Sequence, residues 1–416
     1  MKKIVETNLD DQRISLHPLD DIESIQNSFT IIIGSNNSGK SRLLKNIIQI
    51  SSDENYSFDK IIGFSTAHFN KLPTPFKINE NYIKFSTNPA DFIFGQDKYS
   101  KDLDKYEKII DDYIKNNEVD FFLKNNISSL HINQLFEIFI SSNKDQVQKY
   151  NDWKIISKFL NLPESIEFKV TQSSHFKKLK KYLEDNKNTS SQKLDKLVNN
   201  KTYNFSLQEM FALDKKIIEL LQLRLLSITK IAYQHESKSL PLTSLSSGQL
   251  SILTLGLALI SSIQNNSLIC IDEPELNLHP EWQTEIIKLI ELLSKKYTGC
   301  QFFIATHSPQ IISNINSENS YILNLNQNTL TISTKFKDKS SDFQLSQAFN
   351  FPGNNNEFLI RKLIIILNKL NTEEDFILDN ESKELLQHIS LLLKGQKIDQ
   401  EDKVKILFNL VESYRG

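Results

Sequence analysis

A phosphate-binding loop is the first stretch of this 416-residue chain whose residue types and spacing could do chemistry. Gly34, Gly39, Lys40 and Ser41 fit the pattern G-x-x-x-x-G-K-[ST] without a gap. In such a loop, backbone N–H groups and the positive end of the following helix bind a β-phosphate, while the lysine reaches the β- and γ-phosphates and the hydroxyl serves Mg²⁺. The predicted nucleotide contacts are Gly34, Ser35, Asn36, Asn37, Ser38, Gly39, Lys40, Ser41 and Arg42. For Arg42 a place on the helix surface is favoured over the role of an arginine finger.

An acidic pair after four apolar residues is the second candidate. Asp272 and Glu273 follow the apolar run 268–271. Asp272 has the position of a carboxylate that holds Mg²⁺ through water, and Glu273 could polarise an attacking water as a general base. An isolated Asp-Glu pair after such a run is more often a helix cap or a turn. The phosphate loop upstream favours the catalytic interpretation, in which Ser41 and Asp272 serve the metal and Lys40 and Glu273 act in catalysis.

The strands that must position these residues can be recognised from their apolar runs. Residues 29–33 precede the phosphate loop, and an apolar-periodic helix follows it. Residues 60–64 and 302–305 also read as strands, and the second of these is followed by a polar cluster that contains His307. Open α/β sheets bind ligands at the carboxyl ends of their strands, so these polar clusters are predicted to converge on one site. The predicted fold class is therefore α/β.

The pattern of strand and helix signals divides the chain into four parts. Residues 1–102 and 227–340 are predicted to form the two halves of a head with a mixed sheet and flanking helices. From 103 to 226 strand signals fade and helical segments are joined by polar linkers, which predicts a helical insertion. Residues 341–416 read as a helical tail. The length suffices for one large α/β unit and at least one further domain.

Charge and hydropathy limit the function classes. The 49 Lys and Arg residues balance 51 Asp and Glu residues, so no global field attracts nucleic acid or membrane. No apolar run approaches the roughly twenty residues that span a bilayer, and the first residues lack the apolar core of a signal peptide. We therefore expect a cytoplasmic protein without membrane contact. One compact basic run is better explained as a solvated helix face than as a contact to nucleic acid or a partner: Lys177, Lys178, Lys180 and Lys181.

The polar clusters, taken in order along the chain, resemble a known clan of ATPases. The phosphate loop, LSSGQ (Leu245 to Gln249), ICIDEPE with LNLHP, and THS together resemble the ATP-binding-cassette (ABC) clan. Within that clan, EPE-x-x-LHP looks like the OLD, RecF and AAA_21-type ATPases and unlike transporters. The resemblance implies an ABC-type ATPase head that binds ATP with Mg²⁺ and pairs with a second head, so that two ATP molecules lie between them.

The resemblance also implies roles for residues outside the phosphate loop. The signature segment, Ser246, Ser247, Gly248 and Gln249, would contact the ATP held by the other subunit, with Ser246 and Gly248 on the γ-phosphate. An exposed helix N-terminus is independently suited to bind an anion. His307 matches a switch histidine that senses the γ-phosphate; the alternative is a histidine that caps a turn. Residues 277–279 occupy the place of a loop that crosses the interface.

Two departures from the clan pattern are visible in the sequence. Ser247 replaces the first glycine of the signature segment. The glutamine that usually follows a strand of the head and touches Mg²⁺ has no clear counterpart, because the strand at 60–64 is followed by residues 65–68 without a glutamine, and Gln96 lies in a loop of unknown position. The residue that links ATP to the insertion is therefore left unassigned.

The predicted function is that of an ATPase subunit. The segment GFSTAHFNKLP resembles PtuA-like ATPases of bacterial anti-phage systems, in which the ATPase accompanies a separate nuclease, and the sequence shows no nuclease motif of its own. We expect a head-to-head homodimer or a higher oligomer whose ATP state gates a separate nuclease effector, with DNA or RNA contacted through the complex. The alternative is a DNA-repair ATPase of RecF or SMC type that acts as an ATP-dependent clamp. A transporter ATPase is disfavoured.

Overall fold

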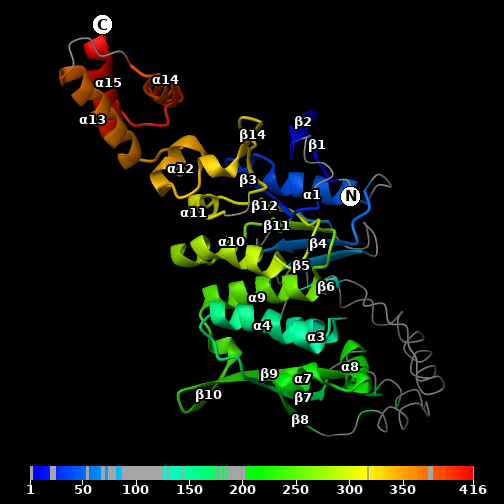
Figure 1. The fold of residues 1–416 in the computed structure, drawn as a ribbon. Helices are drawn as coiled ribbons and strands as arrows, with labels where there is room; N and C mark the ends of the chain where they lie inside the picture. The colour runs from blue at the N-terminus through cyan, green and yellow to red at the C-terminus, as the bar shows by residue number, and fades with distance from the viewer. Residues whose placement is uncertain are drawn as a thin grey trace.

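The computed structural model describes most of the chain. The described residues are 3–18, 25–52, 56–66, 71–73, 81–86, 126–128, 132–142, 144–173, 176, 177, 180, 181, 184, 198, 202–223, 225–315, 318–372 and 378–415. Figure 1 shows them as stacked layers of sheet and helix, from which a group of C-terminal helices projects.

An eight-stranded sheet forms the centre of the described structure (Figure 1). In spatial order its strands are β14 (Thr329–Ile332), β13 (Ser320–Asn324), β3 (Ser28–Ile33), β12 (Gln301–Ala305), β11 (Ser267–Asp272), β4 (Lys60–Ser65), β5 (Tyr82–Ser86) and β6 (Asn126–Ser128). All neighbouring pairs are parallel except β13 and β14. Strands β3 and β11 are buried along their whole length, as expected for parallel strands covered on both faces. The strands predicted at 29–33, 60–64, 268–271 and 302–305 are confirmed.

Helices cover both faces of this sheet (Figure 1). On one face lie α1 (Lys40–Ile50) and the hairpin of β1 (Glu6–Leu9) and β2 (Gln12–Ser15), and they share an apolar cluster with the sheet. On the other face lie α9 (Ser247–Ser262) and α10 (Pro280–Ser294). The apolar residues of α9 point in all directions around its axis, and most of them are buried, because the helix is packed between layers. The predicted α/β head with flanking helices is confirmed.

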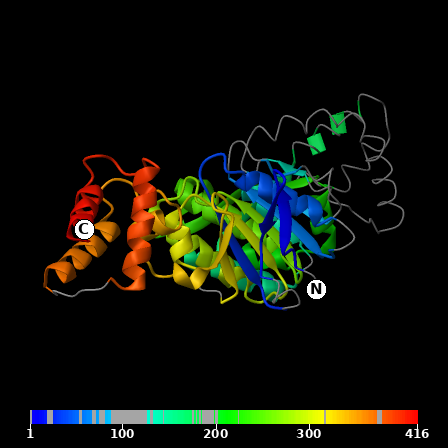
Figure 2. The same cartoon turned by 90° about the horizontal axis from the view of Figure 1, so that it is seen from above.

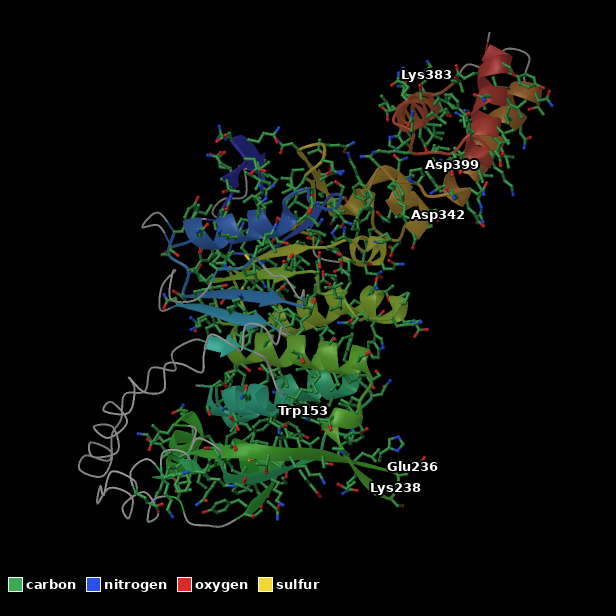
Figure 3. All side chains as sticks on the ribbon, turned by 180° about the vertical axis from the view of Figure 1, so that it is seen from behind. Trp153, Glu236, Lys238, Asp342, Lys383 and Asp399 are labelled. Carbon is green, nitrogen blue, oxygen red and sulfur yellow. The ribbon has the colours of Figure 1, made fainter. Side chains whose placement is uncertain are left out.

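A second sheet lies beyond α9 (Figure 1). It is antiparallel, in the order β10 (Lys238–Pro241), β9 (Leu226–His235), β7 (Ile166–Gln172), β8 (Tyr203–Ser206). The helices around it are α3 (Ile132–Ser141), α4 (Gln146–Phe159), α7 (Leu207–Phe211) and α8 (Lys215–Gln222). Trp153 of α4, labelled in Figure 3, is fully buried and packs against Phe136 of α3, which in turn contacts Phe168 of β7. The hairpin of β9 and β10 ends near Glu236 and Lys238 at the edge of the molecule.

The prediction of a helical insertion from 103 to 226 needs correction. The described part of this segment contains strands β6, β7 and β8 as well as helices, and β9 begins at the predicted boundary and pairs with β7. Strand β7 alternates buried and exposed residues with a period of two, but it is only seven residues long and its partners lie far away in sequence. The predicted helix at 103–116 lies outside the described residues. Of the basic run, Lys177 and Lys181 are exposed and Lys180 pairs with Glu184.

Four helices end the chain: α12 (Ser341–Gln347), α13 (Glu357–Thr372), α14 (Asn380–Lys394) and α15 (Lys403–Arg415). The last three share an apolar cluster of their own and project from the body (Figures 1 and 2). Asp342 of α12 lies at the base of this group, whereas Lys383 and Asp399 lie farther out (Figure 3). The shorter elements are α11 (Pro309–Ser313) and 3₁₀ turns at Leu242–Ser244 and Ser333–Lys335. In the described part of the chain, no helix has the length and apolar character needed to cross a membrane.

Candidate nucleotide-binding and hydrolysis site

The phosphate loop connects the buried strand β3 to helix α1. Gly39 is the N-cap of α1 and has φ 99°, and Asn37 has φ 65°, so the chain turns through two residues in the left-handed region. A Cβ atom on Gly34 would lie 2.5 Å from Ser38 Oγ. The two glycines of the motif are therefore required by the tight course of the backbone, which agrees with the interpretation of the sequence.

Lys40 folds back over the loop. Its Nζ donates to the carbonyl oxygens of Gly34 at 3.1 Å and Ser35 at 3.2 Å, and the residue is only 6% exposed. Burial lowers the pKa of Lys40, while the carboxylates of Glu273, Asp272 and Glu275 act in the opposite direction. A cation held by neutral carbonyl groups in a buried place would gain from a phosphate, which supplies the missing negative charge.

The N-terminus of α1 is suited to an anion. No side chain caps the helix, and within the described residues no acceptor is found for the N–H groups of Lys40 and Ser41. The Ser38 hydroxyl is also buried without a partner there. Residues 35–37 are exposed, so a ligand can reach these donors. Unpaired donors at the positive end of a helix fit the phosphates of a nucleotide.

Ser41 and Asp272 meet although they lie far apart in the sequence. Ser41 Oγ donates to Asp272 Oδ1 at 3.2 Å. Burial raises the pKa of Asp272 to about 6, and Asp272 Oδ2 is buried with no hydrogen bond from the described residues. A divalent cation would supply a positively charged partner for this buried carboxylate. The described residues contain no group of three or more His, Cys, Asp and Glu side chains fit to hold a metal. Mg²⁺ takes few protein ligands and keeps waters and phosphate oxygens, and the oxygen atoms of Ser41 and Asp272 are of the kind that it prefers.

Glu273 and His307 face each other at the ends of β11 and β12. Glu273 Oε1 lies 3.6 Å from His307 Nε2, and both side chains are partly exposed. Glu273 has φ 52°, and its N–H donates to Ala305 O at 2.9 Å. Burial, and then the nearby Lys40, lower the pKa of His307 to about 4, so its imidazole is neutral near pH 7. A water beside this pair could donate to the carboxylate of Glu273, and a phosphate oxygen could accept a hydrogen bond from the neutral ring of His307.

Three residues of this site were not picked out from the sequence. Glu275 Oε1 accepts from the N–H of His307 at 2.6 Å, and burial raises the pKa of its carboxyl group to about 7. Thr306 contributes a further hydrogen bond to Glu275. Thr66, after β4, donates its hydroxyl to the carbonyl of Glu273. Glu275 and Thr306 belong to the motifs ICIDEPE and THS that carry the resemblance, and Thr66 lies directly after the predicted strand at 60–64, but no role was assigned to any of the three.

The signature segment lies apart from this cluster. Ser246 caps α9: its Oγ accepts from Gln249 N at 3.3 Å, and its own N–H donates to Gln249 Oε1 at 3.1 Å. Helix α9 lies on the face of the sheet opposite α1 (Figure 1), and within the described residues no hydrogen bond or ion pair joins the signature segment to the phosphate loop. Ser246 and Ser247 are exposed, while Gly248 is buried beside Trp282.

The remaining predicted positions are also located. Arg42 is a half-buried residue that pairs with Asp10 of the β1–β2 turn at 2.6 Å, and its guanidinium lies beside Gly39, where an added Cβ would be 3.2 Å from Arg42 Nη2. Asn277 has φ 65°, Leu278 is buried, and His279 is the N-cap of α10. Gln96 lies outside the described residues. Thus the structure brings together the phosphate loop, Asp272, Glu273 and His307 in one chain, and leaves the signature segment elsewhere.

Residues 29–313 match the model of the AAA_21 family, described as "AAA domain, putative AbiEii toxin, Type IV TA system". The chain belongs to this family. AAA_21 proteins are P-loop ATPases of the ABC clan, so the resemblance seen in the sequence is confirmed. The matched region begins in β3 and ends in α11, and it includes every site residue described above.

Three curated proteins are similar to this AAA_21 chain. The retron Ec83 probable ATPase of Escherichia coli is 28% identical over 206 residues, which cover 46% of this chain and 37% of that protein. The retron Vc95 probable ATPase of Vibrio cholerae is 24% identical over 368 residues, which cover 72% of this chain and 70% of that protein. The endonuclease GajA of Bacillus cereus is 25% identical over 367 residues, which cover 70% of this chain and 53% of that protein. The chain therefore spans about a third of the Ec83 protein and about half of GajA.

Proposed function

We propose that this chain binds and hydrolyses ATP as the ATPase subunit of a bacterial anti-phage defence complex. One observation carries the ATPase part: Lys40, the Ser41–Asp272 pair and the Glu273–His307 pair converge where the adjacent strands β3, β12 and β11 end. In the proposed reaction, the loop amides and Lys40 bind the phosphates. Ser41 and Asp272 hold Mg²⁺, which when bound polarises the phosphate oxygens. Glu273 orients the attacking water and accepts its proton at Oε1, and neutral His307 donates to a γ-phosphate oxygen.

The substitution Glu273→Gln tests this assignment. It keeps the shape of the side chain and the Mg²⁺ ligands but removes the base, so phosphate release should fall by roughly 10²- to 10⁴-fold while calorimetry shows unchanged ATP binding. Glu281→Gln is the matched control, because Glu281 is an exposed residue of the first turn of α10. Wild-type turnover in Glu273→Gln would show that the base lies elsewhere.

We further propose that two heads share their sites. The exposed N-terminus of α9 lies apart from the phosphate loop of its own chain, so a second head would have to bring its signature segment to that loop. In this arrangement Ser246 and Gly248 contact the γ-phosphate across the interface. Residues 277–279 lie at the interface between the two heads. The result is a homodimer or a higher oligomer closed by ATP.

The defence role rests on the relatives. Two of them are probable ATPases of retrons, and another is an endonuclease. We propose that ATP binding in this chain gates a separate nuclease, which contacts DNA or RNA within the complex. Nucleotide and effector binding are then reciprocally coupled, so each must change the affinity of the other by the same factor.

Purification of the chain with the products of its neighbouring genes tests the gating proposal. We expect a stable nuclease partner, identified by mass spectrometry, whose affinity differs between ATP, ADP and no nucleotide. Equal affinity in all three states, or no partner, would contradict gating. In that case the alternative of a RecF- or SMC-like ATP-dependent DNA clamp would be favoured, and nucleic-acid binding with and without ATP would be measured next.

A further inference from the structure

Thr66 lies where the clan pattern has a glutamine that touches the metal and where this chain has none. It follows β4 directly, and β4 is the neighbour of β11 in the sheet, with Ser65 opposite Asp272. Thr66 is 7% exposed. Its N–H donates to Asp272 O at 3.4 Å and its hydroxyl donates to Glu273 O. Thr66 therefore contacts the main chain of both acidic residues.

The peptide groups of Glu273 are held from both neighbouring strands. Its N–H is bound by Ala305 of β12, and its carbonyl oxygen is bound by Thr66 after β4. Glu273 also has φ 52°, a left-handed conformation that costs a non-glycine residue about 1 kcal/mol or more and persists only where the surroundings enforce it. The direction of its side chain toward His307 depends on this backbone conformation.

We propose that Thr66 is a positioning residue for ATP hydrolysis, which fixes the Glu273 peptide through its hydroxyl and so aims the carboxylate at the water. This inference rests on the proposed function. In this proposal Thr66 acts through Glu273, by way of the Glu273 main-chain carbonyl group. Strands β4, β5 and β6 form one edge of the sheet, next to β11. A shift of this edge would move Thr66 and would therefore change the position of the Glu273 peptide group.

The variants Thr66→Val and Thr66→Ser test the role of the hydroxyl. Valine keeps the shape but cannot donate, so kcat should fall by about tenfold or more, because small displacements of a catalytic group are costly. ATP affinity measured by calorimetry and KM should stay within about twofold, because the phosphate loop is untouched. Serine restores the donor and should recover most of kcat. A Thr66→Val enzyme with wild-type kcat, or with ATP affinity reduced as much as kcat, would overturn the proposal.

Thr30→Val is the matched control. Thr30 is a buried strand residue whose hydroxyl also donates to a main-chain carbonyl, that of Leu16, at 2.9 Å. Both valine variants should lower the thermal stability by similar amounts, but only Thr66→Val should lower kcat. If Thr66 were merely structural, the two variants would behave alike.

The double variant Thr66→Val with Glu273→Gln separates this inference from the function on which it rests. If Thr66 acts through Glu273, it should cause no further loss in the Glu273→Gln background. If neither the wild type nor any variant hydrolyses ATP, the proposed function fails. If Glu273→Gln abolishes turnover while Thr66→Val does not change it, only the role of Thr66 is refuted.

Discussion

Two helix N-termini in this molecule have the features of anion sites, and they differ in how their first amides are used. Helix α1 begins after Gly39 in the left-handed region, and no side chain caps it. Helix α9 begins after Ser246 and carries a complete capping box, in which Ser246 and Gln249 satisfy each other. The first N–H groups of α1 are therefore open to a ligand, whereas α9 already has an acceptor for one of its own.

Because the two termini differ in their caps, a helix dipole alone does not define a phosphate site. At α1 the unpaired amides, buried Lys40 and the Ser41–Asp272 pair are all in one chain. At α9 the hydroxyl of Ser246 is used as an acceptor in the cap of its own helix. In a shared site, a second chain would bring the phosphate to α9, and the phosphate would replace the Ser246 cap. We therefore expect α1 to govern ATP binding by one chain and α9 to govern what two chains do together.

The largest effect is expected for Lys40→Ala. Loss of the buried cation should weaken ATP binding by roughly 30-fold or more, which corresponds to about 2 kcal/mol. The control is Lys45→Ala, which removes a cation farther along α1 and outside the phosphate loop and should change affinity by less than about fivefold. Calorimetry on both variants measures this. Unchanged ATP affinity in Lys40→Ala would refute the assignment of the loop.

Ser246→Arg should give the next largest effect. The new side chain would obstruct the α9 surface, so hydrolysis should be lost while one chain still binds ATP through α1. Mixing Ser246→Arg with Lys40→Ala places both defects in one shared site and leaves the other intact, so partial hydrolysis should return if sites are shared and act singly. Failure to recover would also be compatible with two sites that must act together. Full activity of Ser246→Arg alone would exclude the shared-site model.

A pH effect should distinguish the two regions next. The α1 region faces carboxylates, and the pKa of Glu275 is raised from its ordinary 4.5 to about 7 by burial. A raised pKa means that folding favours the protonated form, so this contribution to stability is complete below about pH 4.5 and is lost as the pH rises through 7. In nucleotide-free protein this loss should appear as a fall in thermal stability between about pH 5 and pH 8.

Glu275→Gln removes this titration. Its melting temperature relative to wild type should therefore be higher at pH 8 than at pH 5, as followed by thermal unfolding without nucleotide or metal. Glu281→Gln, at an exposed position, is the control and should show no such trend. Parallel pH curves for Glu275→Gln and wild type would contradict the assignment of a buried, proton-binding carboxyl group.

The smallest effect is expected for Ser246→Ala. It removes the capping side chain of α9 and should destabilise the protein by about 1 kcal/mol. ATP affinity of the single chain should stay unchanged, because α1 is not involved. Ser244→Ala is a suitable control, because Ser244 has an exposed hydroxyl in the preceding turn that bonds only to Pro241 O in the described structure. A marked loss of ATP affinity in Ser246→Ala would show that the two termini are not independent.

The strands and the local motifs of the head could be predicted because each is encoded in a few adjacent residues. The spacing of Gly34, Gly39 and Lys40 specifies a loop with left-handed turns, and the apolar runs of β3 and β11 specify strands buried on both faces. The second sheet was missed because β7 and β8 are short and are stabilised by pairing with distant segments: β7 pairs with β9, which lies more than fifty residues away in the sequence, and β8 pairs with β7. The likeness to PtuA-type ATPases stays a prediction.

The residue types and their spacing along the chain show which groups can do chemistry. The fold brings some of these groups into contact. Sequence spacing placed Lys40 in the phosphate loop and Asp272 and Glu273 after an apolar strand. Only the strand order β3, β12, β11, β4 brings Ser41 to Asp272, His307 to Glu273 and Thr66 to the Glu273 carbonyl. The reason is physical: the identity of a parallel strand's neighbours is set by hydrogen bonds and packing between distant segments, and no local pattern records it.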